Sequence, residues 1–259
     1  KVDCTPVPRP PVLCPGCPHR GFFYEVSRLK DVVVTGDIGC YTLGSAEPLC
    51  ALDTTICMGA GFSAGVGMAK AFARRGENKK VIGVLGDSTF FHSGITGALE
   101  IMYNNGNMIP CVLDNSITAM TGHQPNPGVC TAVLGEGCNH LDIESVVRGI
   151  GVTDVAKVKP FNMRSTLKTI EEMKARSGVR VIIAEEPCML FARRTLKQNR
   201  PQVAEVVTQG EEALKCLAEL ACPAFRRGGT AEAPVVSVDE SQCSGCMVCL
   251  QVTPAIRAR

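Results

Sequence analysis

Two polar residues, each placed just after an apolar run, could together bind a metal ion. Asp87 follows the run 81–85, and Asn115 follows the run 108–113. Both runs are short, apolar and end at turn-forming residues, which predicts buried strands. A carboxylate oxygen and an amide oxygen suit Mg²⁺, which takes oxygen ligands and completes its shell with substrate phosphates. The backbone carbonyl of Ile117 is the natural candidate for a third protein ligand.

The segment between the two runs determines whether these oxygens meet. Its apolar residues recur at the spacing of one helix face, and 104–106 ends the helix; they are Ile95, Leu99, Met102 and Tyr103. A strand, helix, strand crossover is parallel, so Asp87 and Asn115 are expected just past the carboxyl ends of neighbouring strands, where open α/β sheets bind ligands. The alternative is that Asp87 only caps a helix and Asn115 is an ordinary loop residue.

The composition excludes several classes of function. The 259 residues carry a formal net charge of +2, so neither nucleic acid nor an anionic membrane is expected as a partner. Only 5% of the residues are aromatic and Trp is absent, which argues against stacking on bases. The sequence shows no signal peptide and no apolar run of about 20 residues, and we therefore expect a cytoplasmic protein.

Fifteen cysteines, some of them in CxxC pairs, indicate metal or redox chemistry. Soft thiolates favour Fe–S clusters or zinc. Cys14 and Cys17 form a CxxC pair that alone could bind zinc or form a redox disulfide. Cys40 and Cys188 each follow a predicted strand, at the sheet edge that carries Asp87, and a turn holding the pair could reach this edge. We expect these four thiols to surround one point, although any one of them alone could be a small buried apolar residue.

Several stretches of the chain resemble a known family. Gly86-Asp87-Ser88, followed by Asn115, resembles the Gly-Asp-Gly…Asn signature of thiamine diphosphate enzymes, with Ser88 in the last glycine position. Residues 13–22, 36–44, 53–71 and 114–122 resemble the α subunit of indolepyruvate:ferredoxin oxidoreductases, which belong to the 2-oxoacid:ferredoxin oxidoreductases. The resemblance covers about residues 10–259. It implies an α/β fold with a doubly wound parallel sheet, the thiamine diphosphate-binding fold, and a short ferredoxin-like Cys-rich tail.

The resemblance also implies an activity and its cofactors. The expected reaction is the thiamine diphosphate-dependent oxidative decarboxylation of an aryl 2-oxo acid such as indolepyruvate to acyl-CoA and CO₂. Electrons would pass through Fe–S clusters to ferredoxin, and a [4Fe–4S] cluster nearest the thiamine would be held by Cys14, Cys17, Cys40 and Cys188. A non-oxidative thiamine-dependent decarboxylase and a non-catalytic Cys-rich electron carrier or zinc scaffold are the alternatives.

Further residues acquire expected roles from the same resemblance. Met58 would support the bent cofactor, unless it simply fills the core, and the Ile56 carbonyl would face the cofactor's amino group. The irregular loop from 116 to 137 is expected to cover the diphosphate, with Thr118 and Thr121 as donors. His19, His92 and His123 are weak candidates for acid–base groups, since a lone His is more often structural.

Two other patterns have competing interpretations. The small residues Gly59, Gly61 and Ala64 match a loose dinucleotide fingerprint, but they better fit close packing of a helix on the sheet. The basic segment 193–200 is expected to be a solvated helix face or, less favoured, a contact for an acidic ligand such as coenzyme A.

The chain divides into four expected segments. Residues 1–12 form a Pro-rich lead-in, 13–200 the thiamine diphosphate-binding domain, 201–234 a helix and linker, and 235–259 a truncated ferredoxin-like segment. Cys243, Cys246 and Cys249 in the last segment suggest a second Fe–S site. Thr253 stands before Pro254, where the bacterial ferredoxin run has its fourth cysteine.

The resemblance places some of the catalytic equipment outside this sequence. In the family, an earlier half of the α subunit binds the pyrimidine end of thiamine and supplies a Glu that activates it. Lys1 does not look like a natural start, so we expect a fragment, or a partner polypeptide that carries this half, together with a β subunit. The chain alone is therefore expected to be catalytically silent.

Overall fold

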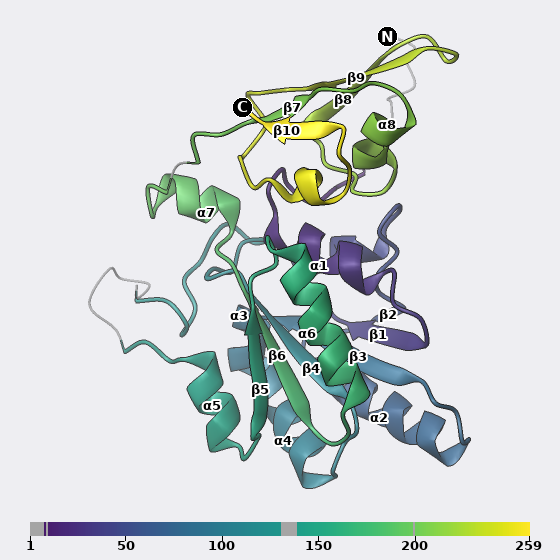
Figure 1. Cartoon of the computed structure of the whole chain (residues 1–259). Coiled ribbons are helices and arrows are strands. Elements are labelled where there is room, and N and C mark those ends of the chain that lie inside the picture. Colours follow the sequence, from purple (N-terminus) through teal and green to yellow (C-terminus); the bar gives the residue numbers. More distant parts are fainter. Residues whose placement is uncertain (1–7, 9, 131–138, 199) are drawn as a thin grey trace, which may run out of the picture.

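A six-stranded parallel sheet forms the larger part of the molecule (Figure 1). The computed structural model describes residue 8 and residues 10–130, 139–198 and 200–259. Most of the predicted lead-in 1–12 and the end of the predicted loop 116–137 lie outside these residues. In spatial order the strands are β2 (Thr54–Thr55), β1 (Val32–Gly36), β3 (Lys80–Gly86), β4 (Ile109–Asp114), β6 (Arg180–Glu185) and β5 (Asp154–Val158).

Helices cover both faces of this sheet. One face packs on α1 (Pro18–Val26) and α6 (Met163–Ala175), through side chains such as Phe22, Phe23 and Ile170. The other face carries α2 (Ala60–Arg74), α4 (Ile95–Tyr103) and α5 (Ile143–Gly149), through side chains that include Phe62 and Ile101. The predicted doubly wound parallel sheet is therefore confirmed. The chain leaves β1 for β2 on one side and returns to β3 on the other, so the order reverses between β1 and β3, where such folds bind ligands.

The strands predicted at 81–85 and 108–113 and the helix between them lie where expected, as β3, β4 and α4, with one error in which side of this helix is buried. Leu99 and Tyr103 of α4 are 49% and 85% exposed, whereas Gly97, Ala98 and Ile101 are buried. A Cβ at Gly97 would lie 2.9 Å from the Phe62 Cβ of α2. Small residues thus allow α4 to approach α2 closely. The buried face of α4 is therefore the one that packs closely, and not the one with the large apolar residues Leu99 and Tyr103. The helix α7 (Met189–Arg194) includes only the start of the basic segment 193–200.

The interpretation of residues 59–64 as a close-packed helix start, rather than a dinucleotide site, agrees with the structure. A Cβ built at Gly61 would lie 2.1 Å from the Val84 carbonyl oxygen of β3. The hydroxyl of Thr35, in β1, donates to the Gly61 carbonyl oxygen at 2.6 Å. Glycine at this position therefore lets the first turn of α2 touch the backbone of the sheet.

We expect Gly61→Ala to lower the free energy of unfolding by about 1–3 kcal/mol, because the added methyl group forces α2 away from β3. Gly67→Ala is the matched control on the same helix, since a Cβ there meets nothing within 4 Å. It should leave stability unchanged or raise it by up to about 1 kcal/mol, through better helix propensity. Urea denaturation of both variants makes the comparison, and equal stability of Gly61→Ala and the parent would contradict the close contact.

A smaller unit follows the sheet domain and packs on α1 and α6 (Figure 1). In chain order it consists of β7 (Ala204–Val206), α8 (Glu211–Ala218), β8 (Phe225–Gly229), β9 (Pro234–Val238), the 3₁₀ helix η3 (Val248–Gln251) and β10 (Ile256–Ala258). β7 pairs antiparallel with β10, and β8 pairs antiparallel with β9. The segment 201–234, predicted to be a helix and a linker, thus begins with a strand, β7, and has the strand β8 of a hairpin after its helix.

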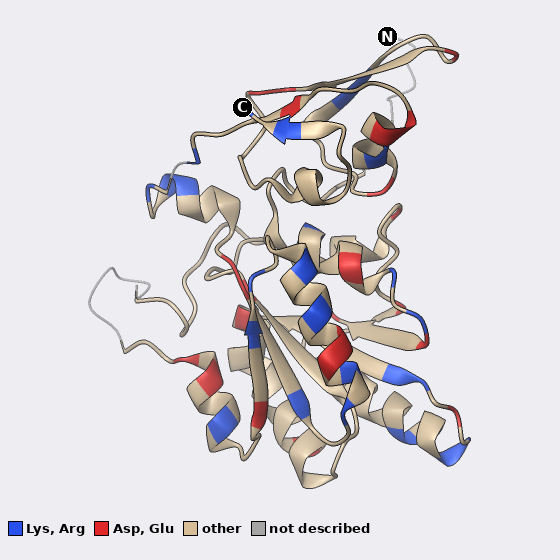
Figure 2. Ribbon diagram, in the orientation of Figure 1, with Lys and Arg blue, Asp and Glu red and all other residues tan. Residues whose placement is uncertain are grey.

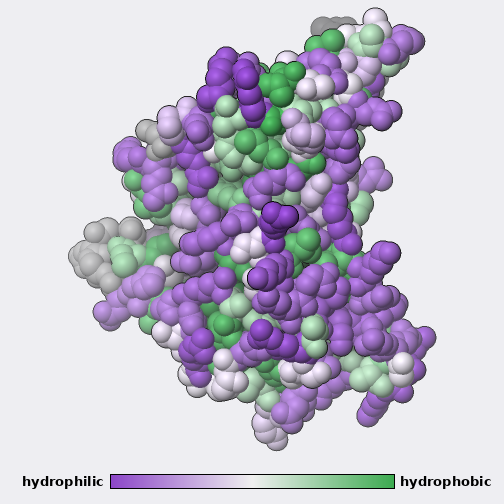
Figure 3. All heavy atoms as spheres, in the orientation of Figure 1, coloured by the Kyte–Doolittle hydropathy of each residue, from purple (hydrophilic) through white to green (hydrophobic). Residues whose placement is uncertain are grey.

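The surface carries mixed charges. Lys and Arg alternate with Asp and Glu over the helices of the sheet domain (Figure 2). The visible face is mostly hydrophilic there, with apolar patches over the smaller unit (Figure 3). Among the described residues, no helix is both long enough and apolar enough to cross a bilayer.

Candidate functional site

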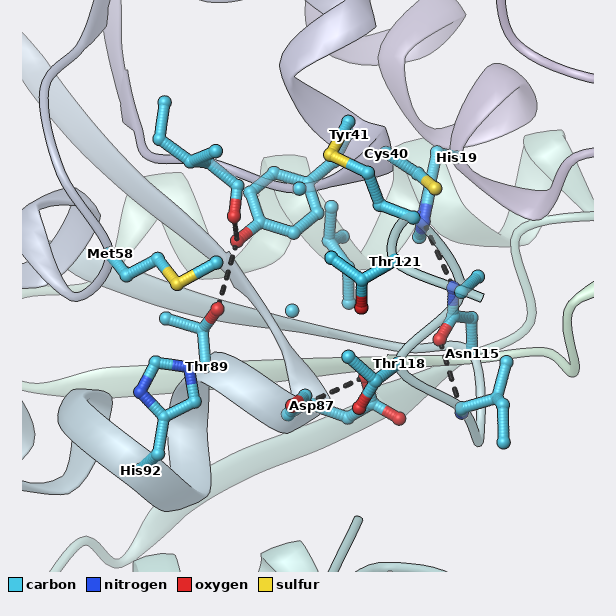
Figure 4. A pocket seen from close by; sticks show the side chains of 18 residues that line it. His19, Cys40, Tyr41, Met58, Asp87, Thr89, His92, Asn115, Thr118 and Thr121 are labelled. Atoms are coloured by element: carbon cyan, nitrogen blue, oxygen red, sulfur yellow. Dashed lines mark hydrogen bonds between the residues drawn. The ribbon is translucent and has the colours of Figure 1, made fainter. Parts of the chain in front are cut away.

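A cavity of about 230 Å³ opens at the carboxyl edge of the sheet, beside the ends of β3 and β4 (Figure 4). Asp87, directly after β3, and Asn115, directly after β4, both line it. Asp87 also begins a short helical stretch, α3 (Asp87–Thr89), which continues through a π-helical turn, η2 (Phe90–Gly94), into α4. The structure therefore brings together the two side chains that the sequence suggested as Mg²⁺ ligands.

The Asp87 carboxylate is buried and held by polar neighbours. It is 3% exposed, and it accepts hydrogen bonds from the Ser88 backbone N–H at 2.9 Å and the Asn126 side-chain amide at 2.9 Å. Burial, followed by the nearby charge of Asp114, raises its pKa to about 7. A second buried carboxyl group, that of Asp114, also has a raised pKa, mainly through burial. Two acids at the ends of adjacent strands thus create a site that a cation would stabilise.

The Asn115 side chain is fixed on both sides. Its Oδ1 accepts from the Ile117 backbone N–H at 3.3 Å, and its Nδ2 lies 3.5 Å from the His19 Nε2. Burial lowers the pKa of His19 to about 4, so this imidazole is neutral at pH 7. His19, from α1, thus positions Asn115 and also lines the cavity.

The other predicted cofactor contacts divide into two groups. Met58, Thr118 and Thr121 line the cavity together with Gly86, Ser88 and Ile117. Ile56 does not line it and is 61% exposed. His92 is a lining residue, whereas His123 lies elsewhere, with its Nε2 3.9 Å from the Cys188 Sγ.

Three residues of the site were not predicted. Asp37, at the end of β1, is fully buried and accepts a hydrogen bond from the Gly59 backbone N–H at 2.8 Å. The Tyr41 hydroxyl, whose ring lines the cavity, also donates to Asp37. Asn126, which bonds to Asp87, comes from the loop after β4. Asp37 could have been found by the rule that identified Asp87, because it too follows an apolar strand, but a loop asparagine gives no such signal.

The residues around this cavity fit a metal-bound diphosphate. None of the eighteen lining residues is Lys or Arg, and Asp87 is the only acid among them. A diphosphate would bring more negative charge to a buried carboxylate, so a divalent cation is needed to hold it there. Within the described residues, no three His, Cys, Asp or Glu side chains are close enough together to hold a metal ion. The predicted Mg²⁺ ligands include only one such side chain, since the other two are amide and carbonyl oxygens.

A second cavity, of about 260 Å³, adjoins the first and contains all four predicted cluster cysteines. Cys14 and Cys17 come from the turn before α1, Cys40 from the start of the 3₁₀ helix η1 (Cys40–Ser45), and Cys188 from the turn before α7 (Met189–Arg194). Cys40, Asn115, Ala119 and Met120 line both cavities. Four thiols that are far apart in sequence therefore meet beside the Asp87 site.

These four thiols are close enough to influence each other electrostatically. Burial, with smaller contributions from Cys40 and Cys14, raises the pKa of Cys17 to about 12. Burial, with Cys188 and Cys14, raises the pKa of Cys40 to about 11. Zinc would hold its sulfur ligands at about 2.3 Å, and within the described residues no three of these thiols are close enough together to hold a single ion.

The tail cysteines line a third cavity, between α1 and the smaller unit. Cys243, Cys246 and Cys249 face it together with Cys17 and Cys222. Thr253 is not among the lining residues, and its hydroxyl donates to the Glu212 carboxylate at 2.8 Å. The position where the sequence suggested a missing fourth ligand is therefore turned toward α8.

A comparison with known protein families shows to which family of proteins this chain belongs. Residues 37–184 match the family described as "Thiamine pyrophosphate enzyme, C-terminal TPP binding domain". The chain belongs to this family, and the matched range includes β1, β3 and β4, whose ends form the Asp87 cavity.

More specific similarities concern particular proteins. The chain is 40% identical over 259 residues to the indolepyruvate oxidoreductase subunit IorA of Archaeoglobus fulgidus, and 36% identical over 270 residues to that of Thermococcus kodakarensis. Each alignment covers 98% of this chain but only 40% and 41% of the relative. The chain therefore spans about two fifths of the length of these relatives.

A solved structure has the same fold. It is that of a 2-oxoglutarate:ferredoxin oxidoreductase from Magnetococcus marinus with 2-oxoglutarate, coenzyme A and succinyl-CoA bound. The TM-score is 0.56 at 20% identity, over 70% of this chain and 66% of the other.

Proposed function

We propose that this chain is the diphosphate-binding part of a thiamine diphosphate-dependent enzyme that oxidatively decarboxylates a 2-oxo acid. The observation that carries the proposal is the adjacency of two cavities, one with Asp87 and Asn115 and one with four thiols, which share Cys40 as a lining residue. A carboxylate and an amide suit Mg²⁺ and a diphosphate, and four thiols suit a [4Fe–4S] cluster. Decarboxylation coupled to single-electron transfer needs both.

In this proposal the chain's residues hold and orient the cofactors. Asp87, Asn115 and the Ile117 carbonyl bind Mg²⁺, and Ser88, Thr118 and Thr121 lie within the cavity that would receive the diphosphate. Gly86 leaves the space that the Tyr41 ring occupies, since a Cβ there would lie 2.8 Å from the ring. Thiamine diphosphate supplies the electron sink for loss of CO₂, and the cluster accepts single electrons.

The mouth of the cavity suggests a partner. Ile38, Met58 and Met120 line it and are 37%, 46% and 49% exposed. Exposed apolar residues around a binding site are typical of a surface that another protein part covers. We propose that the pyrimidine-binding half of the enzyme covers this mouth and Ile56, and that Met58 and the Ile56 carbonyl then contact the cofactor.

The substrate and the remaining partners are proposals from the relatives. Their name, indolepyruvate oxidoreductase, favours an aryl 2-oxo acid such as indolepyruvate. The solved structure is that of a 2-oxoglutarate:ferredoxin oxidoreductase with coenzyme A and succinyl-CoA bound, and it favours acyl-CoA as product and ferredoxin as electron acceptor. A β subunit and a cytoplasmic location complete the proposal.

Two alternatives explain fewer observations. A non-oxidative thiamine-dependent decarboxylase would have no use for four thiols around one cavity beside the cofactor. A Cys-rich electron carrier or zinc scaffold would have no use for the buried Asp87 and its polar neighbours.

The proposal is tested by separating binding from turnover. We expect the isolated chain to bind thiamine diphosphate only with Mg²⁺, as measured by calorimetry with and without a chelator. We expect no turnover of any 2-oxo acid, because among the described residues Asp87 is the only acid that lines the cavity, and the Glu that activates the pyrimidine ring is proposed to come from the pyrimidine-binding half. Adding the pyrimidine-binding half and the β subunit should restore ferredoxin reduction by indolepyruvate. Metal-independent binding, or turnover by the chain alone, would contradict the proposal.

A further inference from the structure

Arg20 is a buried cation without an acidic partner. It is the third residue of α1 and 3% exposed, and within the described part of the chain its guanidinium donates hydrogen bonds to backbone carbonyl oxygens alone. The start of a helix carries a positive partial charge, which disfavours a cation there. A buried charge with no counter-charge is costly, so this position needs an explanation.

The carbonyl groups that accept from Arg20 belong to two distant segments. Its Nη1 donates to the carbonyls of Leu220 and Ala221, just after α8, at 2.6 Å and 2.7 Å. Its Nη2 donates to the carbonyls of Leu13 and Cys14, the latter at 3.5 Å, in the turn of the first CxxC pair. One side chain of α1 thus ties the turn that carries two of the proposed cluster ligands to the smaller unit.

The CxxC turn also touches the smaller unit directly. Gly16 in this turn has a φ of +71°, and a Cβ there would lie 1.9 Å from the Ser244 Oγ. Glycine therefore serves both the left-handed backbone conformation and the close approach. The turn is held at two points, by Arg20 and at Ser244, so its position depends on the smaller unit.

The groups near Arg20 that could supply negative charge are thiols. Arg20 lines the third cavity together with Cys17, Cys222 and the tail cysteines, and no Asp or Glu is among the described residues that line it. Glu219, directly before the two carbonyls that follow α8, pairs instead with Arg28 at 2.6 Å. Cys17 also lines the second cavity. A cluster bound by the four thiols of the second cavity would therefore bring negative charge close to the guanidinium.

We propose that Arg20 is a positioning residue that fixes the CxxC turn against the smaller unit, and that its charge raises the reduction potential of the cluster in the second cavity. The inference rests on the proposed function, in which oxidation of the 2-oxo acid supplies single electrons to this cluster. Each electron adds one negative charge, and a buried cation stabilises the reduced cluster more than the oxidised one. Arg20 thus makes the cluster easier to reduce without contacting the thiamine cavity.

The test compares Arg20→Gln with Arg20→Lys in the anaerobically purified full chain. Gln keeps an amide donor but loses the charge, whereas Lys keeps the charge but loses the planar fork. Redox titration followed by EPR measures the potential, and the signal of this cluster is the one that Cys40→Ser removes. Arg20→Gln should lower the ratio of reduced to oxidised cluster at a fixed potential by about tenfold or more, and tenfold is about 59 mV for one electron. Arg20→Lys should stay closer to the parent.

Arg28→Gln is the matched control. Arg28 follows α1 and also reaches the smaller unit, through Glu219, but the two side chains are 41% and 37% exposed. Solvent screens such a charge, so this variant should leave the potential of the cluster unchanged. A purely structural role for Arg20 would instead lower the melting temperature of both Arg20 variants without separating their potentials. Equal potentials in Arg20→Gln and Arg20→Lys would therefore overturn the proposal.

The iron content of the variants decides the remaining cases. Loss of this cluster from Arg20→Gln, with retention in Arg20→Lys, would support the need for the charge. Loss from both, with retention in Arg28→Gln, would show that the fork is needed for assembly and would overturn a role of the charge in the potential. A parent without iron would contradict the proposed function itself, whereas a parent with iron and no shift in Arg20→Gln contradicts only the role of Arg20.

Discussion

Replacing Asp87 with alanine is expected to weaken Mg²⁺-dependent binding of thiamine diphosphate by at least about 100-fold. Removal of residues that only support a metal ligand costs 10- to 100-fold, and Asp87 is proposed as a ligand itself. It is also the only acid that lines the cavity in the part of the chain that the structure describes. Calorimetric titration of the chain with thiamine diphosphate at saturating Mg²⁺ measures the change.

Two controls separate this effect from misfolding. Glu185→Gln removes a carboxylate from the same edge of the sheet, where Glu185 pairs with Lys159 at the surface at 3.2 Å, and it should not change binding. The ligand-free Asp87→Ala protein should melt no lower than the parent at pH 7. The pKa of Asp87 is raised to about 7, so its ionisation destabilises the ligand-free fold as pH rises from about 4 to 7. Unchanged affinity in Asp87→Ala would remove Asp87 from the Mg²⁺ site.

The second large effect concerns the cluster that we propose beside the Asp87 cavity. Cys40→Ser and Cys188→Ser should each lower the iron content of anaerobically prepared protein by about four atoms per chain, together with the broad visible absorbance of the cluster. The two residues come from η1 and from the turn before α7, far apart in sequence but on one cavity. A shared loss of iron from both variants is expected only if both thiols bind the same cluster.

Cys50→Ser is the matched control for these variants. Cys50 is exposed and lines none of the three cavities. Its replacement should leave iron content and absorbance unchanged. The electron path through this chain would be wrong if Cys40→Ser kept the iron of the parent, or if the metal in the parent were zinc.

The residues at the carboxyl edge of the sheet could be predicted from the sequence, because a single topological rule determines where they lie. Asp87, Asn115, Cys40 and Cys188 each follow an apolar strand, and parallel strands place their carboxyl ends together. The cavity that joins them therefore follows from local patterns and one topological rule. Asn126 could not be found this way, because its contact with Asp87 depends on how a loop of irregular backbone folds back.

Two errors have a common cause in packing. On α4, the large residues Leu99 and Tyr103 suggested the buried face, but the small residues Gly97 and Ala98 lie against α2. In the smaller unit, β7 pairs with β10 some fifty residues later, and no local pattern encodes that pairing.

The loop after β4 lines both of the proposed cofactor sites, so binding at one site should affect binding at the other. Asn115, Ala119 and Met120 line both the Asp87 cavity and the cavity of the four thiols, and the Cys188 backbone N–H bonds to the Asn115 carbonyl at 2.8 Å. In the proposed function a ligand in either cavity contacts this segment and holds it in place for the ligand that binds second. Cluster assembly should therefore tighten thiamine diphosphate binding, and the cofactor should protect the cluster by the same free energy, because such coupling is reciprocal.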